Sequence, residues 1–206
     1  MQKFVKPIVF VFCLVPLVWL LWLTLHNGLG ANPIEKITHY TGEWALRFLW
    51  LTLAITPLRK LFGWSVLVRF RRMLGLYTFF YACLHFLTYL VLDQFFDFGE
   101  IAADILKRPY ITVGFAALVL LVPLAVTSTN KMIKRLGRRW KQLHQLVYVV
   151  AVLAVLHFLW LVKADTFEPL VYAVLLLALF SVRAWYQNQD KRKQRIPKKG
   201  VVESSP

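Results

Sequence analysis

The segment "LHQLVYVVAVLAVLHFLW", residues 143–160, contains no Lys, Arg, Asp or Glu over eighteen residues, yet it carries two histidines. His144 stands near its start and His157 near its end, thirteen positions later. A helix of this length and composition can enter a lipid bilayer, where an ionisable side chain is costly and is a functional candidate by default. The segment therefore predicts a membrane-spanning helix whose histidines have a chemical role.

The composition of the whole chain also indicates a membrane protein. It has 206 residues, of which 59% are hydrophobic, and a mean hydropathy of +0.58. The net charge of +15 would suit nucleic-acid binding, but the basic residues lie between apolar runs and are better explained as topology signals. Cys13 and Cys83 both lie within apolar runs, which argues against a disulfide framework and against a zinc site built on cysteine pairs.

Six apolar runs approach the length of about 20 residues that a bilayer-spanning helix needs. The absence of strict two-residue alternation argues against a β-barrel, and no internal repeat is evident. The expected fold is an all-α membrane protein, a bundle of six transmembrane helices. Its spans are expected at residues 8–25, 38–57, 73–92, 110–128, 142–162 and 169–187.

The connections between these runs alternate in charge and predict the orientation. One set holds most of the acidic residues, whereas the other set and the two ends of the chain hold most of the Lys and Arg. The positive-inside rule then places both termini in the cytoplasm, with the first span uncleaved. Residues 98–108 are expected to form a short interfacial helix on the outer side. We expect residues 1–187 to form the transmembrane domain and the basic segment 188–206 to be a disordered cytoplasmic tail.

Two of the histidines are predicted at matching depths in the membrane. His85 lies thirteen residues beyond Arg72, and His157 lies sixteen residues beyond Lys141. A rise of 1.5 Å per residue places them about 20 and about 24 Å from the cytoplasmic boundary. Two imidazoles facing each other across a bundle suit the axial positions of a haem iron, and full axial ligation favours electron transfer. Structural zinc is a weaker alternative, because it usually takes four ligands.

A second candidate site at the inner side of the membrane lacks a paired histidine. His144 lies only three residues beyond Lys141, and the position that would supply its partner, thirteen residues before His85, is Arg72. This site is left open to a haem ligated on one side, a flavin, a quinone, or nothing. The basic rim nearby is explained by positive-inside charge, or by contacts with a flavin phosphate, haem propionates or an acidic partner. Its candidate contact residues are Arg71, Arg72, Arg138 and Arg139.

These features occur in recognisable stretches of sequence. They are "NGLGANPIEKITHYTGEWALRF", "ITPLRK", "RRMLGLYTFFYACLH", "RPYITVGF" and "TSTNKMIKRLGRRWKQLHQLVYVVAVLAVLHFLW". With histidines on the third and fifth spans, the chain resembles the ferric-reductase-like transmembrane domain. Within that superfamily it is most similar to the MsrQ (YedZ) family of haem-binding membrane subunits.

The resemblance implies a b-type cytochrome-like electron carrier of the bacterial inner membrane, with haem b and FMN as cofactors. It implies that His85, His144 and His157 are the in-membrane histidines of the family. Electrons would come from the quinone pool or a cytosolic flavin reductase and pass to MsrP, a periplasmic molybdopterin enzyme that repairs methionine sulfoxide in oxidised proteins. The chain would then be an electron-transfer subunit and not the catalytic reductase itself.

The chain departs from the NADPH oxidases of the same superfamily. It lacks the fourth histidine of their two-haem pattern and their cytoplasmic flavin and nicotinamide module. Two other functions stay open at this point. One is a self-contained quinol- or metal-reducing oxidoreductase, and the other is a membrane anchor without redox activity. Nucleic acid is not an expected partner, whereas membrane lipid is.

Overall fold

The computed structural model describes residues 2–162 and 166–195, and within them the chain is helical without any strand. A 3₁₀ turn at Ser65–Arg69 and a π-helical turn at Tyr89–Asp93 interrupt the α-helices. The α-helices are α1 (Gln2–Leu25), α2 (Pro33–Phe62), α3 (Arg71–Thr88), α4 (Phe98–Lys107), α5 (Pro109–Val126), α6 (Asn130–Leu136), α7 (Arg138–Leu143), α8 (Leu146–Leu161) and α9 (Phe167–Arg195).

Local residues explain where the main helices begin and end. The Asn32 side chain accepts a hydrogen bond from the Glu35 amide and caps α2, with Pro33 at the first helical position. Gly63 ends the same helix with φ of 71°, a left-handed conformation that glycine adopts without steric cost. Pro109 begins α5 in the same way as Pro33 begins α2.

Five of the described helical segments are long and apolar enough to cross a membrane, which confirms the membrane class of the fold. They are Val5–Leu25, Arg71–Asp93, Pro109–Val126, Arg138–Leu161 and Phe167–Asp190. The expected second span belongs to α2, whose 30 residues extend about 45 Å. This helix is more polar than the others because it carries Glu43 and Arg47 in its middle, so a sixth crossing stays a prediction.

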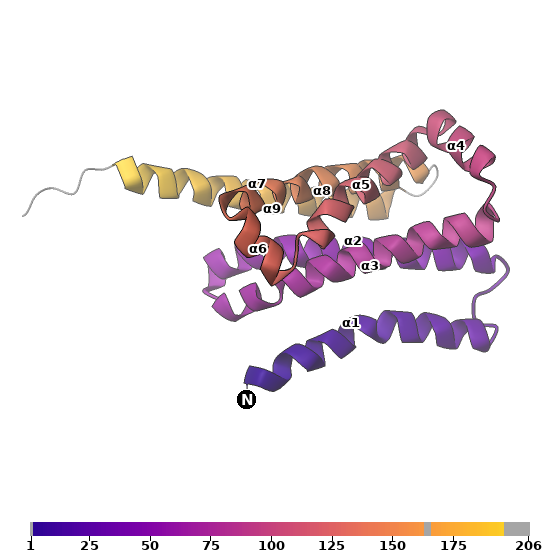
Figure 1. Cartoon of the computed structure of the whole chain (residues 1–206), viewed down its shortest axis with the longest axis horizontal. Coiled ribbons are helices and arrows are strands. Elements are labelled where there is room, and N and C mark those ends of the chain that lie inside the picture. The colour runs from indigo at the N-terminus through magenta and orange to yellow at the C-terminus, as the bar shows by residue number, and fades with distance from the viewer. Residues whose placement is uncertain (1, 163–165, 196–206) are drawn as a thin grey trace, which may run out of the picture.

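Two antiparallel helix pairs form the centre of the bundle. The most extensive helix contacts are those of α2 with α3 and of α5 with α8, and α9 packs against α2 and α8. Figure 1 shows these helices side by side along the long axis of the molecule. The largest group of buried side chains, contributed by α2, α5, α8 and α9, consists of Leu46, Leu49, Trp50, Leu53, Ala117, Leu121, Val150, Ala151, Val155 and Leu176.

Helix α1 lies at the edge of the bundle and contacts α2 and α3 over a small area (Figure 1). Two tyrosines of α3 hold it through backbone carbonyls. The Tyr77 hydroxyl donates to Phe10 O at 2.8 Å, and the Tyr81 hydroxyl donates to Cys13 O at 2.9 Å. These contacts lie close to Pro16, whose missing amide leaves the helix short of a hydrogen bond.

The two ends of the bundle differ in character. The expected short helix in segment 98–108 is confirmed as α4, which begins with the Asp97 side chain accepting from the amides of Gly99 and Glu100. It lies at one end of the molecule, whereas α6, α7 and the N-terminus lie towards the other end (Figure 1). Helix α9 continues to Arg195, beyond the boundary expected at residue 187, because no Pro or Gly interrupts it. Residues 196–206 of the expected tail lie outside the described residues.

Candidate cofactor site

A cavity of about 310 Å³ lies between the two helix pairs. Its wall is mostly apolar and comes from α2, α3, α5 and α8, with a few polar groups at one end. A cavity of this size and composition is typical of a small-molecule or cofactor site. His85 of α3 and His157 of α8 both belong to its wall.

The structure brings His85 and His157 together, as the matching depths predict. Their ring centroids are 6.0 Å apart, and the ring planes form an angle of 75°. No group of three or more His, Cys, Asp or Glu that could hold a metal occurs in residues 2–162 and 166–195. The cavity therefore offers a pair of imidazoles and not a multi-ligand metal cage.

Backbone carbonyls determine the orientation of both rings. His85 Nδ1 is 2.9 Å from Thr38 O, and His157 Nδ1 is 2.7 Å from Tyr110 O. A carbonyl oxygen can only accept, so Nδ1 carries the proton and donates in each case. The Nε2 atom of each neutral ring is then the one with a free lone pair, and it makes no hydrogen bond to the described part of the chain. An imidazole whose other nitrogen donates to a carbonyl is oriented as a metal ligand.

Two glycines leave room for these rings. A Cβ on Gly42 would lie 3.0 Å from His85 Nδ1, and a Cβ on Gly114 would lie 2.6 Å from His157 Nδ1. Any side chain at Gly114 would therefore displace the ring of His157, and one at Gly42 would press on His85. The sequence reasoning did not identify either glycine.

The two histidines are held by the same arrangement twice. In each case the accepting carbonyl lies 47 residues before the histidine, and the glycine follows that carbonyl by one helical turn. Thr38 and Gly42 of α2 serve His85, whereas Tyr110 and Gly114 of α5 serve His157. The spacing of 47 residues between carbonyl and histidine occurs twice in the sequence, so it could have indicated the pairing of these residues. The residues around the two sites show no evident repeat.

The structure does not bring His144 to this pair. Its ring stacks on Trp140 with centroids 4.0 Å apart, and its Nε2 is 3.1 Å from Thr127 Oγ1. Thr127 Oγ1 donates its only proton to Pro123 O at 2.6 Å, so His144 Nε2 carries a proton and is the donor. The nitrogen that is free in the other two histidines is therefore occupied here, and a cofactor role for His144 stays a prediction.

The four arginines expected to contact phosphate or propionate groups lie away from the cavity. None of them belongs to its wall, and Arg72 donates to the Asn130 side chain. Arg71 and Arg72 begin α3, whereas His85 is close to its end, about 20 Å away along the helix. Arg138 and Arg139 are exposed in α7.

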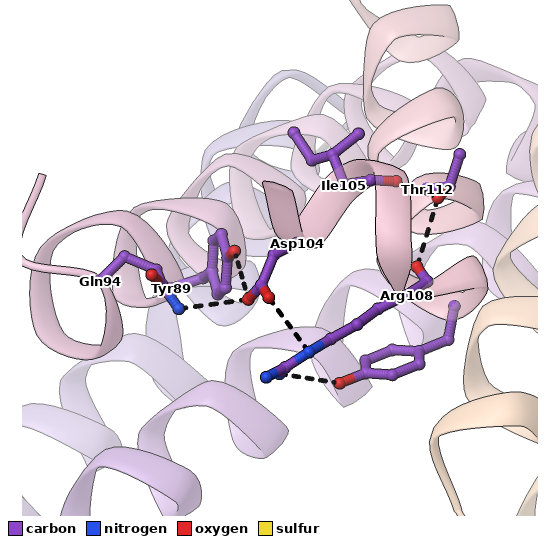
Figure 2. Close-up of polar contacts among 7 residues, drawn as sticks. Tyr89, Gln94, Asp104, Ile105, Arg108 and Thr112 are labelled. Atoms are coloured by element: carbon purple, nitrogen blue, oxygen red, sulfur yellow. Dashed lines mark hydrogen bonds and ion pairs between the residues drawn. The ribbon is translucent and has the colours of Figure 1, made fainter. Parts of the chain in front are cut away.

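The polar end of the cavity lies near α4 and contains an arginine that sequence reasoning did not single out. Arg108 belongs to the cavity wall together with His39, Glu43 and Asp93. Figure 2 shows Arg108 beside Asp104, and Arg108 also donates to the Tyr110 hydroxyl at 3.4 Å. The hydrogen bond with Tyr110 and the nearby Asp104 carboxylate raise the pKa of Arg108 above its ordinary value, so its guanidinium stays charged.

Comparison with known proteins relates this architecture to a family. Residues 41–155, which extend from α2 into α8, match the family model of the ferric reductase like transmembrane component. A protein of Herminiimonas arsenicoxydans is 53% identical over 192 residues, which cover 92% of this chain and 88% of that protein. It is named protein-methionine-sulfoxide reductase heme-binding subunit MsrQ. The chain belongs to the MsrQ family.

Other members of the MsrQ family show similar agreement. The protein of Rhodospirillum rubrum is 57% identical over 190 residues, covering 92% of this chain and 91% of its own length. The protein of Xanthomonas oryzae pv. oryzae is 55% identical over 174 residues, covering 84% of this chain and 80% of its own length. Both carry the same MsrQ name. No solved structure matches the chain.

Proposed function

We propose that this chain binds haem b between His85 and His157 and carries electrons through the membrane to a protein-methionine-sulfoxide reductase. The observation that carries the proposal is the pair of imidazoles, 6.0 Å apart, whose Nδ1 atoms are both tied to backbone carbonyls. The relatives are named heme-binding subunits of such a reductase, which supports both the cofactor and the kind of partner.

The residues present fit a haem. Two metal–nitrogen bonds of about 2 Å, extended by the half-width of each imidazole ring, give a centroid separation of about 6 Å. Gly42 and Gly114 let both rings withdraw against the helices behind them, and the apolar wall suits a flat macrocycle. His85 and His157 would hold the haem iron, and the haem would supply reversible one-electron transfer.

The chain's own residues have three tasks in this proposal. Thr38 and Tyr110 orient the ligand nitrogens through their carbonyl groups. The apolar walls of α2, α3, α5 and α8 exclude water from the cofactor. Six crossings with both termini in the cytoplasm would place the histidine pair in the outer half of an inner membrane, close to a periplasmic acceptor.

The partners belong to the same proposal. MsrP, a periplasmic molybdopterin reductase, would receive the electrons, and the quinone pool or a cytosolic flavin reductase would supply them. The basic inner rim, with Arg71, Arg72, Arg138 and Arg139, offers charge for the phosphate of FMN or for an acidic donor. Flavin content of the pure protein tests the FMN assignment, and haem content with oxidised and reduced spectra tests the haem assignment.

The decisive experiment replaces histidines in the full-length chain. His85→Ala and His157→Ala are each expected to abolish the low-spin haem spectrum of the purified protein. His26→Ala is the matched control, because His26 is exposed and its Nδ1 bonds only to Trp22 O within its own region. A double variant at positions 85 and 157 that keeps normal haem absorbance would contradict the proposal.

A second measurement tests the electron acceptor. The reduced chain is mixed with the periplasmic reductase, with a quinone or with ferric iron, and the return of the oxidised spectrum is followed. We expect rapid oxidation by the periplasmic reductase in the presence of methionine sulfoxide. Oxidation by quinone or iron alone would favour a self-contained oxidoreductase, and a colourless preparation from haem-replete cells would favour an anchor.

A further inference from the structure

Arg108 occupies a constrained position at the polar end of the cavity. It is the last residue before Pro109 and joins the end of α4 to the start of α5. Its backbone is extended, with φ of −109° and ψ of 99°, which is the conformation that a following proline imposes. The sequence thus fixes the backbone from which the guanidinium reaches the cavity wall.

Two neighbouring side chains hold the guanidinium. Arg108 Nε forms an ion pair with Asp104 Oδ1 at 3.1 Å, and Arg108 Nη1 donates to the Tyr110 hydroxyl at 3.4 Å. Asp104 is only 6% exposed, and its Oδ2 accepts from the Tyr89 hydroxyl at 3.2 Å and from Gln94 Nε2 at 3.3 Å (Figure 2). The buried carboxylate is therefore contacted by three polar side chains, those of Tyr89, Gln94 and Arg108.

The guanidinium of Arg108, in contrast, has N–H donors that these contacts do not use. An arginine carries five N–H groups, and these contacts use two of them. The other three make no hydrogen bond to the described residues. Arg108 is also the only Lys or Arg in the described cavity wall, where the nearby acid Glu43 is already paired with Arg47 at 2.7 Å. A cation that is fixed in place and keeps unused donors at the end of an apolar cavity is suited to a ligand with an anionic end.

We propose that Arg108 binds a propionate carboxylate of the haem, with Asp104 as its positioning residue. This inference rests on the proposed haem function. The two propionates of haem b leave the same edge of the macrocycle, so one cation at this end orients the whole ring. The propionate edge would face α4, and the inner arginines Arg71, Arg72, Arg138 and Arg139 would not contact it.

Tyr110 connects this contact to the axial ligand. Its backbone oxygen accepts from His157 Nδ1, and its side-chain hydroxyl accepts from Arg108. The residue that orients one ligand of the iron therefore also helps to hold the cation for the carboxylate. Binding at either point would stabilise the other through the first turn of α5.

The test compares two forms of the ligand. The full-length chain, stripped of cofactor in detergent, is titrated with haem b and with its dimethyl ester, which has no free carboxylate. An arginine–carboxylate hydrogen bond predicts that the wild type binds haem b about ten- to a hundredfold more tightly than the ester. Arg108→Gln should reduce this preference to near unity, and Arg108→Lys, which keeps the charge but loses the planar fork, should retain part of it.

Lys107→Gln provides the matched control, because Lys107 is an exposed cation next to Arg108 and lies outside the cavity wall. It should keep the wild-type preference for haem b over the ester. An Arg108→Gln variant that also keeps it would overturn the carboxylate contact. Failure of the proposed haem function is distinguishable, because the wild type would then give no bis-histidine spectrum with either ligand.

The reduction potential separates a charge contact from a structural one. Removing the cation in Arg108→Gln should lower the haem potential, since a nearby positive charge favours the reduced state. Asp104→Asn frees the guanidinium, so a positioning role predicts a smaller lowering of the potential in the same direction. A potential of Asp104→Asn that equals or exceeds the wild-type value would overturn the assignment of Asp104 as a positioning residue.

Discussion

At the scale of single residues, the chemistry of the cavity depends on which imidazole nitrogen is free. Carbonyls of α2 and α5 accept from Nδ1 of His85 and His157, which leaves Nε2 as the basic atom in both rings. His144 has the opposite arrangement, because Thr127 occupies its Nε2. His85 and His157 lie within helices, whereas His144 lies in the turn between α7 and α8, and the three rings differ in which nitrogen faces an acceptor.

The space that each glycine leaves beside a histidine ring predicts how strongly a glycine-to-alanine substitution reduces haem binding. A Cβ would lie 2.6 Å from His157 at Gly114 and 3.0 Å from His85 at Gly42, whereas at Gly75 its nearest neighbour would be 3.8 Å away. Overpacking of this kind costs about 1–3 kcal/mol. We expect Gly114→Ala to lose most of the bound haem and Gly42→Ala to lose less. Gly75→Ala should match the wild type, with haem content per protein as the measurement.

Two results for these glycine variants would contradict the prediction. A Gly114→Ala protein with wild-type haem content would mean that the His157 ring need not occupy its observed position. Loss of haem in Gly75→Ala, where the added methyl group only makes ordinary contact, would indicate a general effect of alanine on α3.

At the scale of elements, α1 differs from the other long helices. Its outward face is exposed, and its links to the bundle include two tyrosine hydroxyls that donate to the carbonyls of Phe10 and Cys13. The Tyr81 side chain is only 1% exposed, so its hydroxyl cannot exchange this acceptor for water. The packing of α1 therefore depends on a few specific polar contacts.

Removing one of these hydroxyls should loosen α1. Tyr81→Phe leaves the carbonyl of Cys13 without its donor and is expected to lower the free energy of unfolding by about 1–2 kcal/mol. Tyr40→Phe serves as the control, because its hydroxyl makes no hydrogen bond to the described residues and its ring contact with Trp44 is retained. Thermal unfolding in detergent at one scan rate measures the difference. Equal midpoints for the two variants would contradict a specific role for the Tyr81 bond.

At the scale of the whole molecule, the number of crossings depends on α2. The helix is as long as a span and packs along α3, but Glu43 and Arg47 make it less apolar than its neighbours. These two side chains pair with each other at 2.7 Å, which lowers the cost of placing them in a membrane. We therefore retain α2 as a predicted span that is stabilised by the helices around it.

Cysteine labelling tests this topology. In a chain with Cys13 and Cys83 replaced by serine, single cysteines are introduced as Ala31→Cys, Ser65→Cys and Lys131→Cys at exposed positions. If α2 crosses, an impermeant maleimide labels position 31 from outside and labels positions 65 and 131 only after permeabilisation. Labelling of positions 31 and 65 from the same side would show that α2 does not cross the membrane.

Much of the fold could be predicted because long apolar helices are recognisable from the amino-acid composition of the segment. The expected runs overlap with α1, α3, α5, α8 and α9, although a turn at residues 144–145 separates α8 from α7 inside the expected run 142–162, and the short helix in segment 98–108 is α4. The pairing of His85 with His157 followed from counting residues from the charged boundaries. The structure places the two rings close together, because the rise of a helix converts residue number into distance along the bundle.

The rest of the site could not be predicted in this way. Gly42, Gly114 and the carbonyls of Thr38 and Tyr110 act through contacts between helices, and nothing in their local sequence indicates which helix will lie opposite. Arg108 belongs to a predicted outer loop, where a basic residue usually faces solvent. Only the packing of α4 against α5 brings it to the cavity wall.

The sequence by itself determined the helical membrane class, most of the long apolar helices and the position of each histidine along the chain, because these properties depend on composition and on residue order. The tertiary structure decided which nitrogen of each imidazole is free, which residues make room for the rings, and which end of the cavity carries a cation. Those properties depend on the rotation and contact of neighbouring helices. In an apolar bundle many rotations bury similar side chains, so polar contacts at a few positions select one of them.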